Sequence, residues 1–206
     1  MAASIRGRLL MTHETGKAVA RRLHDSRFAT RYLVGNGIDI GSGDDPLTDY
    51  AALFPLIKNV RAWDKGDGDA QTLPGLDANA FDFVLSSHCL EHLAHPVSAL
   101  RRWIGVCKPR GHLIITVPDE DLYEHGLWPS QFNGEHKWSF NLNKDVDDVR
   151  PHSLNLLEIL IGFRYRVEIL SVHLLDAGYD PRRLAAFDQS LLVPCEPAIE
   201  VVLRKR

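Results

Sequence analysis

The sequence predicts an α/β fold with a doubly wound, mostly parallel sheet. Short apolar stretches typical of strands alternate with amphipathic stretches typical of helices along the 206 residues, and this alternation favours a parallel sheet covered on both faces. A glycine-rich turn ends the first apolar stretch, "GNGIDIGSG" at residues 35–43. The composition, with 45% hydrophobic and 25% charged residues, is typical of a globular protein and predicts one domain over residues 1–206.

Local patterns justify each predicted element in turn. An amphipathic helical segment, residues 12–34, opens with the capping residue Thr12, and Pro46 stands at a natural first helical position. The predicted helices after this segment cover residues 45–56, 96–109 and 152–163. The predicted strands cover residues 35–43 with their turn, 57–64, 81–88, 111–119, 165–175 and 198–206, and a short further strand is considered within the polar stretch 65–80.

Residues 119–150 interrupt this alternation. The segment is rich in aromatic residues, histidine, acids and turn residues, and it has no sustained period. Long irregular segments inside a compact domain are usually functional or disordered. Because aromatic residues stand beside polar ones, we expect an inserted segment that covers the substrate.

Charge and cysteine content exclude several classes of protein. The net charge of −3 supplies no field that would gather nucleic acid or an anionic membrane. The three cysteines form no CxxC pair, which argues against a disulfide framework or a thiolate zinc site. No apolar stretch approaches the roughly 20 residues that span a bilayer, and the first residues lack the apolar core of a secretory signal. We therefore expect a cytoplasmic protein without nucleic-acid or membrane partners.

The turn after the first strand points to a ligand. Gly41 and Gly43 remove the Cβ atoms that would keep a ligand from the main chain, and Asp64 ends the second strand, where an acid can accept ribose hydroxyls. The third glycine of the dinucleotide fingerprint is replaced by Asp44-Asp45-Pro46, and carboxylates at a helix start repel a pyrophosphate. This disfavours NAD and favours a cationic ligand without phosphates, although helix capping accounts for either acid alone.

An ordered set of motifs then identifies a family. "GIDIGSG", "WD", "GDAQTLP", "FDFVLSSHCLEHLAHP" and "KPRGHLIITVPDED", over residues 36–121, resemble the motifs of class I S-adenosylmethionine-dependent methyltransferases, and of the type 11-like members in particular. The resemblance implies a Rossmann-like sheet of seven strands with the last strand antiparallel, and S-adenosylmethionine as cofactor. Asp45 at the common third glycine and Arg110 in the usual "KPGG" turn depart from the pattern.

The same resemblance implies the cofactor-binding residues. Asp39, Gly41 and Gly43 would line the methionine end of the cofactor, and Asp64 would hold the ribose hydroxyls. Asp69 and Ala70 would flank the adenine, while Ser86 and Ser87 would close the methionine side.

"HCLEH" supports three interpretations. His88, Glu91 and His92 match the HxxEH order of one class of zinc peptidase, which would make the chain a zinc-dependent hydrolase. That chemistry needs both histidines on an established helix and a third ligand, whereas this motif follows a strand directly. A bound magnesium ion is the second interpretation, but Mg²⁺ prefers oxygen ligands and His88 stands where a carboxylate would be expected. The third interpretation, packing and loop structure, predicts no metal.

Residues of the 119–150 segment are the candidates for the methyl acceptor. Transfer to a hydroxyl needs a positioned base, and His136 and His88 are the predicted catalytic residues, with His125, Glu124, Glu135 and Asp121 as alternatives. Aromatic surfaces beside polar groups suit a sugar. The predicted substrate-binding residues are Tyr123, Trp128, Phe132 and Trp138. The alternative role for these aromatic residues is to seal the segment onto the domain.

The sequence therefore predicts an S-adenosylmethionine-dependent methyltransferase that acts on a hydroxyl of a small molecule or a saccharide. The 119–150 segment also resembles methyltransferase-like proteins associated with bacterial surface-polysaccharide synthesis. A zinc-dependent hydrolase and a non-catalytic protein that binds the same cofactor are the alternatives. Neither the acceptor atom nor the oligomeric state follows from the sequence.

Overall fold

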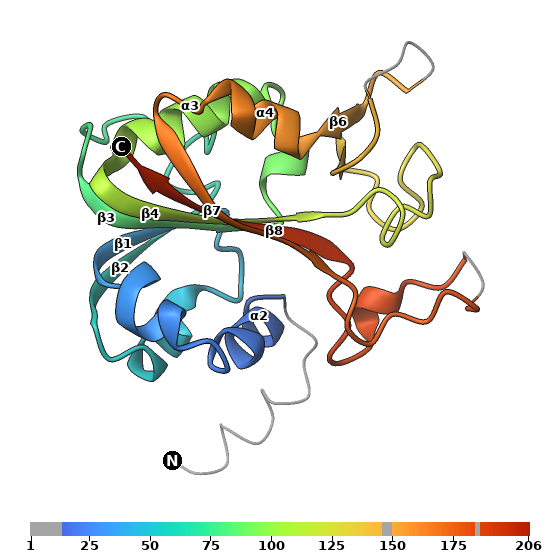
Figure 1. Cartoon of the computed structure of the whole chain (residues 1–206), viewed down its shortest axis with the longest axis horizontal. Coiled ribbons are helices and arrows are strands. Elements are labelled where there is room, and N and C mark those ends of the chain that lie inside the picture. Colours follow the sequence, from blue (N-terminus) through green and yellow to red (C-terminus); the bar gives the residue numbers. More distant parts are fainter. Residues whose placement is uncertain (1–13, 146–149, 184–185) are drawn as a thin grey trace.

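A six-stranded sheet forms the centre of the protein (Figure 1). The structure is a computed structural model that describes residues 14–145, 150–183 and 186–206, so the predicted cap Thr12 lies outside the described residues. The strands of this sheet are β1 (Gly35–Ile40), β2 (Ile57–Trp63), β3 (Phe81–Ser87), β4 (Cys107–Pro118), β7 (Val167–Leu175) and β8 (Ala198–Lys205).

The strand order is β2-β1-β3-β4-β8-β7. The pairs among β1 to β4 are parallel, and β8 is antiparallel to both β4 and β7. The prediction of a mostly parallel sheet whose last strand is antiparallel is confirmed. Parallel pairing brings the carboxyl ends of β1 to β4 to one edge, where doubly wound folds bind ligands.

The predicted count of seven strands is wrong by one for the described residues. Residues 64–80 form turns instead of the further strand considered there. Their backbone groups are used locally, because the Leu73 amide donates to the Asp69 carbonyl at 2.8 Å and the indole of Trp63 donates to the Gly68 carbonyl at 3.2 Å. Backbone groups that are already hydrogen-bonded within turns are not available to pair with a neighbouring strand of the sheet.

Helices cover both faces of the sheet (Figure 1). On one face lie α2 (Glu14–Arg22), the π-helical turn η1 (Phe28–Tyr32) and the 3₁₀ helix η2 (Leu47–Leu53); on the other lie α3 (Pro96–Val106) and α4 (Leu156–Gly162). The 3₁₀ turns η3 (Leu90–His92) and η4 (Gln189–Leu191) belong to the connections.

Two predicted helices begin later than expected. Pro46 has extended backbone, with ψ of 149°, and precedes η2 instead of occupying its first turn. Residues Ser153–Asn155 form strand β6, because they pair with β5 (Ser139–Asn141). Asn155 then caps α4, its side chain accepting a hydrogen bond from the Glu158 amide at 3.1 Å.

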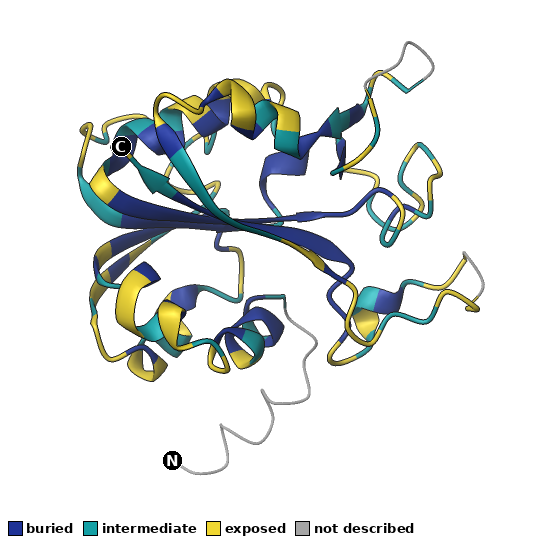
Figure 2. Cartoon of the chain, viewed as in Figure 1, coloured by how far each residue is buried: buried dark blue, intermediate teal, exposed yellow. Residues whose placement is uncertain are grey.

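Apolar side chains fill the space on both sides of the sheet, and the central strands are buried (Figure 2). Trp103 of α3 is fully buried beneath one face, and its indole donates to the Ala70 carbonyl at 2.8 Å. Phe83 and Phe54 are fully buried on the other side. Burial of such side chains contributes about 1.5–3 kcal/mol each, which makes the sheet edge a firm support for a site.

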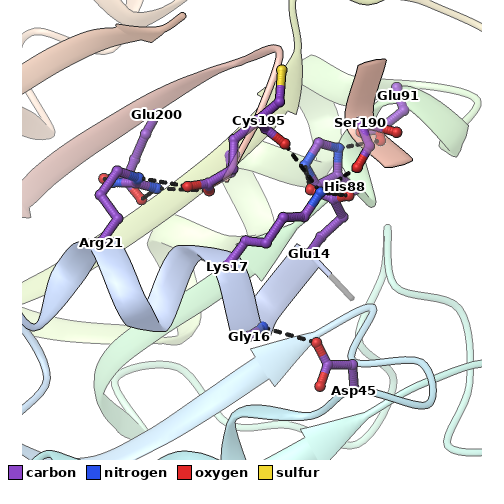
Figure 3. A network of polar contacts seen from close by, with 12 residues as sticks. Glu14, Gly16, Lys17, Arg21, Asp45, His88, Glu91, Ser190, Cys195 and Glu200 are labelled. Atoms are coloured by element: carbon purple, nitrogen blue, oxygen red, sulfur yellow. Dashed lines mark hydrogen bonds and ion pairs between the residues drawn. The ribbon is translucent and has the colours of Figure 1, made fainter. Parts of the chain in front are cut away.

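Buried ion pairs hold helix α2 against the sheet. Arg22 donates to Glu200 of β8 at 2.6 Å, and Arg21 donates to the same carboxylate at 2.8 Å and to Glu196 at 3.0 Å. Lys17, on the same helix, donates to the carbonyls of Ser190 and Cys195 (Figure 3). The beginning of α2 is thereby placed beside the carboxyl edge of the sheet.

The described part of the predicted cover segment also lies at this edge. The strand β5 extends the polypeptide beyond β4 and joins it through a bridge between Asp119 and Phe140. Residues 146–149 of the predicted 119–150 segment lie outside the described residues. Among the residues that the structure describes, no helix has the length and apolar character needed to cross a membrane.

Candidate functional site

A cavity of about 420 Å³ opens at the carboxyl edge of β1, β2 and β3. Each of these three strands is followed by a residue that contributes to its wall. The lining residues are Gly41, Asp64, Lys65, Gly68, Asp69, Ala70, His88, Cys89, His92, Leu93 and Glu135. The volume falls in the range of small-molecule and cofactor sites.

The glycine turn after β1 needs Gly41 for two reasons. Its φ is +76°, and a Cβ at this position would lie 2.5 Å from Cβ and 2.6 Å from Sγ of Cys89. Gly43 also has positive φ, +53°, but a Cβ there would meet no atom within 4 Å among the described residues. Gly41 thus permits the close approach of two loops at the cavity wall, whereas Gly43 serves only the turn.

The predicted cofactor-binding residues divide into two groups. Gly41, Asp64, Asp69 and Ala70 line the cavity, and the other four predicted residues do not. The Asp39 carboxylate is buried and accepts a hydrogen bond from the Leu47 amide at 2.8 Å, and burial raises its pKa to about 6. Ser86 donates to the Ile40 carbonyl at 2.9 Å, which ties β3 to β1. Gly43 and Ser87 also lie outside the cavity wall.

Asp45, at the departure from the family pattern, has a structural partner. Its Oδ2 accepts a hydrogen bond from the Gly16 amide at 2.9 Å (Figure 3). Its Oδ1 accepts from the Tyr50 hydroxyl at 2.6 Å. Gly16 lies in the first turn of α2, where backbone amides have no partner within the helix. Asp45 therefore caps α2 from another part of the chain and not the helix that follows it, since the N-cap position of η2 is Pro46, which offers no side-chain cap.

A cluster of ionisable side chains lies beside the cavity and is centred on Glu91, which is fully buried. Its Oε1 lies 3.7 Å from Nδ1 of His88, 3.8 Å from Nε2 of His92 and 3.9 Å from Nε2 of His136. Glu124 joins the cluster through His136, whose Nδ1 lies 2.6 Å from Glu124 Oε1. We call these five residues the Glu91 cluster. His88 and His92 connect it to the cavity, because both line the cavity wall.

Hydrogen bonds determine the tautomers of two of these histidines. Nδ1 of His136 faces a carboxylate oxygen, and Nδ1 of His92 lies 3.2 Å from the carbonyl oxygen of Glu135. Both partners only accept hydrogen bonds, so both Nδ1 atoms carry the proton. In the neutral rings the Nε2 atoms then carry lone pairs, and both lie near Glu91 Oε1.

Burial governs the acidities within the cluster. It raises the pKa of Glu91 to about 7. Burial, together with the nearby charge of Lys17, lowers the pKa of His88, which keeps this imidazole neutral near pH 7. Both carboxylate oxygens of Glu91 lack a hydrogen-bond donor among the described residues. An unpaired buried carboxylate is unfavourable, and such groups indicate a functional role.

The segment 133–138 holds His136 in this position. The amides of Lys137 and Trp138 both donate to the Glu91 carbonyl, at 2.9 and 3.2 Å, so this segment runs directly against η3. His88 precedes η3, and its φ of +52° lies in the left-handed region. η3 is a three-residue 3₁₀ turn, so HxxEH does not lie on the helix that the zinc-peptidase interpretation requires.

The four aromatic residues predicted to bind substrate do not form one surface. The rings of Tyr123 and Phe132 lie 5.6 Å apart, and Tyr123 lies 5.5 Å from the ring of His136. Trp138 packs against the core and donates to the Leu93 carbonyl at 2.8 Å. This contact fits the alternative in which an aromatic residue seals the segment onto the domain.

Trp128 lines a second cavity, of about 300 Å³. Its ring stacks on His152, with centroids 4.2 Å apart and planes 8° apart. The other lining residues are Glu120, Gly126, Leu127, Ser139 and Arg150. Trp128 and Tyr123 therefore belong to different surroundings.

Sequence reasoning gave two important residues no role of their own. Glu91 entered only as part of the HxxEH pattern and Cys89 only as one of the three cysteines, yet Glu91 is the centre of the cluster and Cys89 adjoins the turn at Gly41. The signal for Glu91 was its position between His88 and His92 in "HCLEH".

Comparisons with known proteins agree with the fold. A family model described as "Methyltransferase domain" matches residues 11–144. The structure is similar to a protein from Listeria monocytogenes described as an S-adenosylmethionine-dependent methyltransferase, with a TM-score of 0.55, 17% identity, and coverage of 93% of this chain and 99% of that one. A comparison with curated protein sequences finds no match.

Two further similar structures contain the demethylated cofactor, S-adenosyl-L-homocysteine (SAH). The N-methyltransferase NodS from Bradyrhizobium japonicum has a TM-score of 0.53 and 12% identity, covering 94% of this chain and 87% of that one. The plantazolicin methyltransferase BpumL has a TM-score of 0.56 and 14% identity, covering 93% of this chain and 84% of that one. Identities this low relate the folds and leave the acceptor of this chain open.

Proposed function

The chain belongs to the class I S-adenosylmethionine-dependent methyltransferases, and we propose that it transfers the methyl group to a hydroxyl of a small molecule or a saccharide. The observation that carries this choice of acceptor is the Glu91 cluster beside the cavity. A neutral amine attacks a sulfonium methyl group without help from a base, whereas a hydroxyl must lose its proton. A buried group of histidines and carboxylates is suited to that task.

We place the cofactor in the cavity at the carboxyl edge of β1 to β3. Asp64 would accept hydrogen bonds from the ribose hydroxyls, and Asp69 with Ala70 would flank the adenine. The absence of a Cβ at Gly41 would let the methionine part approach the main chain. Support for this placement comes from the position of all four residues in the cavity wall. Asp39, Gly43, Ser86 and Ser87 would support the walls from behind.

We assign His136 and His88 to the acceptor side. The Glu124–His136 hydrogen bond directs the lone pair of His136 Nε2 toward Glu91 and away from Glu124. His88 lines the cavity itself. Tyr123 and Phe132 adjoin His136 and would contact the acceptor, while Trp128 would meet a more extended acceptor at the second cavity. A saccharide, whose ring presents an apolar face and a hydroxyl rim, suits these groups, and surface polysaccharides are one source of such acceptors.

Methyl transfer from labelled S-adenosylmethionine tests the proposal. We expect label in hydroxylated acceptors, from a panel of free and nucleotide-linked sugars, polyols and phenols, and none in a matched panel of amines. With the best acceptor, His136→Ala should lower turnover by about 100-fold or more, the range expected for loss of proton transfer. Its affinity for SAH, measured by calorimetry, should stay within about twofold of wild type because His136 is outside the cavity wall.

The matched control is His173→Ala, since His173 is an exposed histidine of β7. This variant should retain both turnover and cofactor affinity. Labelling confined to amine acceptors would contradict the proposed acceptor class. Equal turnover of His136→Ala and wild type would remove His136 from the reaction.

A further inference from the structure

We propose that the Glu91 cluster binds a divalent first-row transition-metal ion, with Glu91, His92 and His136 as its ligands. One potential ligand atom from each of these residues lies within 4.8 Å of the other two. The site departs from the sequence-based expectation of no metal. It also differs from a magnesium site, because two of its three donors are nitrogen atoms.

The tautomers supply the first step of the inference. Glu124 and the Glu135 carbonyl hold the protons of His136 and His92 on Nδ1, so both Nε2 lone pairs converge on a carboxylate oxygen. Neither ring then directs an N–H group toward Glu91, so the electron pairs of the two Nε2 atoms and of an ionised Glu91 repel one another. A cation between them removes that repulsion. Metal-bound histidines have this arrangement, in which the other ring nitrogen donates to a carboxylate or a carbonyl.

Glu91 supplies an independent second step. Its side chain is fully buried, and neither oxygen has a hydrogen-bond donor among the described residues. The distances of 3.8 and 3.9 Å from Oε1 to the two Nε2 atoms are too long for hydrogen bonds. Two atoms bound to one ion at about 2.1 Å can lie up to about 4.2 Å apart, so both distances admit a shared ion. The three ligand atoms lie within 4.8 Å of one another, so the remaining pair would move closer by up to about 0.6 Å when the ion binds.

The charge of the surroundings favours a cation. Glu91 and Glu124 contribute two carboxyl groups to the cluster. His88 Nδ1, 3.7 Å from Glu91 Oε1, adds a third nitrogen near this oxygen, from the cavity side. Imidazole with one carboxylate suits Zn²⁺, Fe²⁺ or Co²⁺, and Mn²⁺ also accepts such mixed ligands.

The ion would have a direct use in the proposed function, and this part of the inference rests on that function. An acceptor hydroxyl bound to the ion has a lowered pKa and releases its proton to solvent. The resulting oxygen attacks the sulfonium methyl group, the O–C bond forms as the S–C bond breaks, and SAH leaves. The lone pair of His136 would then be engaged by the ion, so His136 would act as a ligand, and the loss of turnover expected for His136→Ala would come from loss of the ion instead of loss of a proton acceptor.

Metal binding is tested without any acceptor. Tag-free full-length protein, stripped with a chelator and dialysed, is titrated with Co²⁺ while its visible absorption is followed, and with Zn²⁺ by calorimetry. We expect one ion per chain, and at least about 100-fold weaker binding in Glu91→Gln and in His136→Ala, which each lose a ligand. Glu124→Ala, which loses only the partner of His136, should weaken binding by about 10–100-fold.

Exposed residues of the same types provide the controls. Glu158 lies on α4 and His173 on β7, outside the cluster. The variants Glu158→Gln and His173→Ala should therefore bind the ion with wild-type affinity. Circular dichroism and SAH binding show whether each variant is folded. A folded wild-type protein that takes up no stoichiometric Co²⁺ or Zn²⁺ overturns the inference, and so does wild-type affinity in Glu91→Gln.

The outcome is separable from that of the proposed function. Metal uptake without methylation of any hydroxyl would leave the site in place and refute the acceptor class. If hydroxyl methylation proceeds at an unchanged rate in the stripped protein with excess chelator, the ion has no part in the reaction. If removal of the metal abolishes hydroxyl methylation at unchanged SAH affinity, and Zn²⁺ or Mn²⁺ then restores turnover, the result supports both the metal site and the proposed function.

Discussion

Gly41 and Gly43 share one turn and have positive φ values of +76° and +53°, yet they differ in their surroundings. Only at Gly41 would an added Cβ meet another side chain, at 2.5 Å from Cβ of Cys89. Cys89 is buried and leads into η3, which carries Glu91. The absence of one side chain in the turn after β1 therefore decides how closely the cavity at the carboxyl edge and the Glu91 cluster approach each other.

We expect Gly41→Ala to destabilise the protein by about 2 kcal/mol more than Gly43→Ala. Both variants place Ala at positive φ, which costs about 1 kcal/mol. The first adds the cost of overpacking, about 1–3 kcal/mol. Urea unfolding of the two variants measures the difference, and Gly43→Ala is the matched control for backbone strain. Equal free energies of unfolding would show that the loop at Cys89 moves aside freely.

At the scale of the elements, α2 depends on charges buried at β8. Burial by itself disfavours an ionised Glu200, but Arg22 and Arg21 outweigh it and lower the pKa of this carboxyl to about 2. Its ordinary value is 4.5. A carboxyl with a lower pKa in the folded state stabilises the protein above its unfolded pKa, and this contribution is lost as the pH falls toward 2.

Acid unfolding should therefore report on this anchor. Between pH 6 and pH 3 the unfolded chain binds a proton at Glu200 while the folded one does not, which removes about 2 kcal/mol of stability from the wild type. Glu200→Gln has no such titration, so its deficit in the free energy of unfolding should shrink by about 2 kcal/mol over this range. Urea unfolding at each pH gives these values.

Other buried carboxyls titrate in the same range, and the comparison with Glu200→Gln cancels them because both proteins contain them. Burial raises the pKa of Asp39 and Glu91, the opposite direction from Glu200. The variant Glu158→Gln, on the exposed side of α4, should follow the wild type at every pH. A deficit of Glu200→Gln that stays constant between pH 6 and pH 3 would contradict the anchoring role.

For the whole molecule, the cavity in which we place the cofactor joins loops from three strands with the 133–138 segment, through Glu135. Each loop is ordered by different local contacts. A ligand that bridges them stabilises only the folded chain, so cofactor affinity should appear directly in the thermal unfolding of the protein.

SAH at 100 times its Kd should add about 2.7 kcal/mol to the free energy of unfolding. For a chain of this length that corresponds to a rise in Tm of about 5–10 °C. Asp64→Ala at the same SAH concentration should show half of this rise or less, because lost hydrogen bonds to a charged group weaken binding about tenfold or more. Calorimetric unfolding scans with and without SAH give the measurement.

Asp77→Ala is the control for charge, since Asp77 is exposed and lies outside the cavity wall. Its Tm should rise with SAH as that of wild type does. If Asp64→Ala showed the full rise, the ribose hydroxyls would have to be held elsewhere. If the wild type showed none, the cavity would not be the cofactor site.

Much of the sheet and of the cavity could be predicted from the sequence, because these features depend on short local patterns. Strands β1 to β4 are apolar stretches ended by turn residues, and parallel pairing necessarily brings their ends together. Gly41 and Asp64 follow from that rule. The sequence pattern did not decide whether residues 65–80 contain a further strand. Only the folded chain shows that their backbone amides donate hydrogen bonds within turns.

The Glu91 cluster was decided by the tertiary structure. His88 and Glu91 are close in sequence, but Glu124 and His136 reach them only because the 133–138 segment pairs its amides with the Glu91 carbonyl. The same holds for Asp45, which caps a helix that begins 31 residues earlier at Glu14. Aromatic residues expected on one surface lie in two places for the same reason.

The sequence by itself determined the alternation of strands and helices, the turn at Gly41, the acid at Asp64 and the methyltransferase motifs, because each depends on neighbours along the chain. Only the tertiary structure decided which carboxylates face which imidazoles, how deeply Glu91 is buried and which tautomers His92 and His136 adopt. Distances, burial and hydrogen-bond partners between remote segments are set by packing, and these quantities determine what the site can bind.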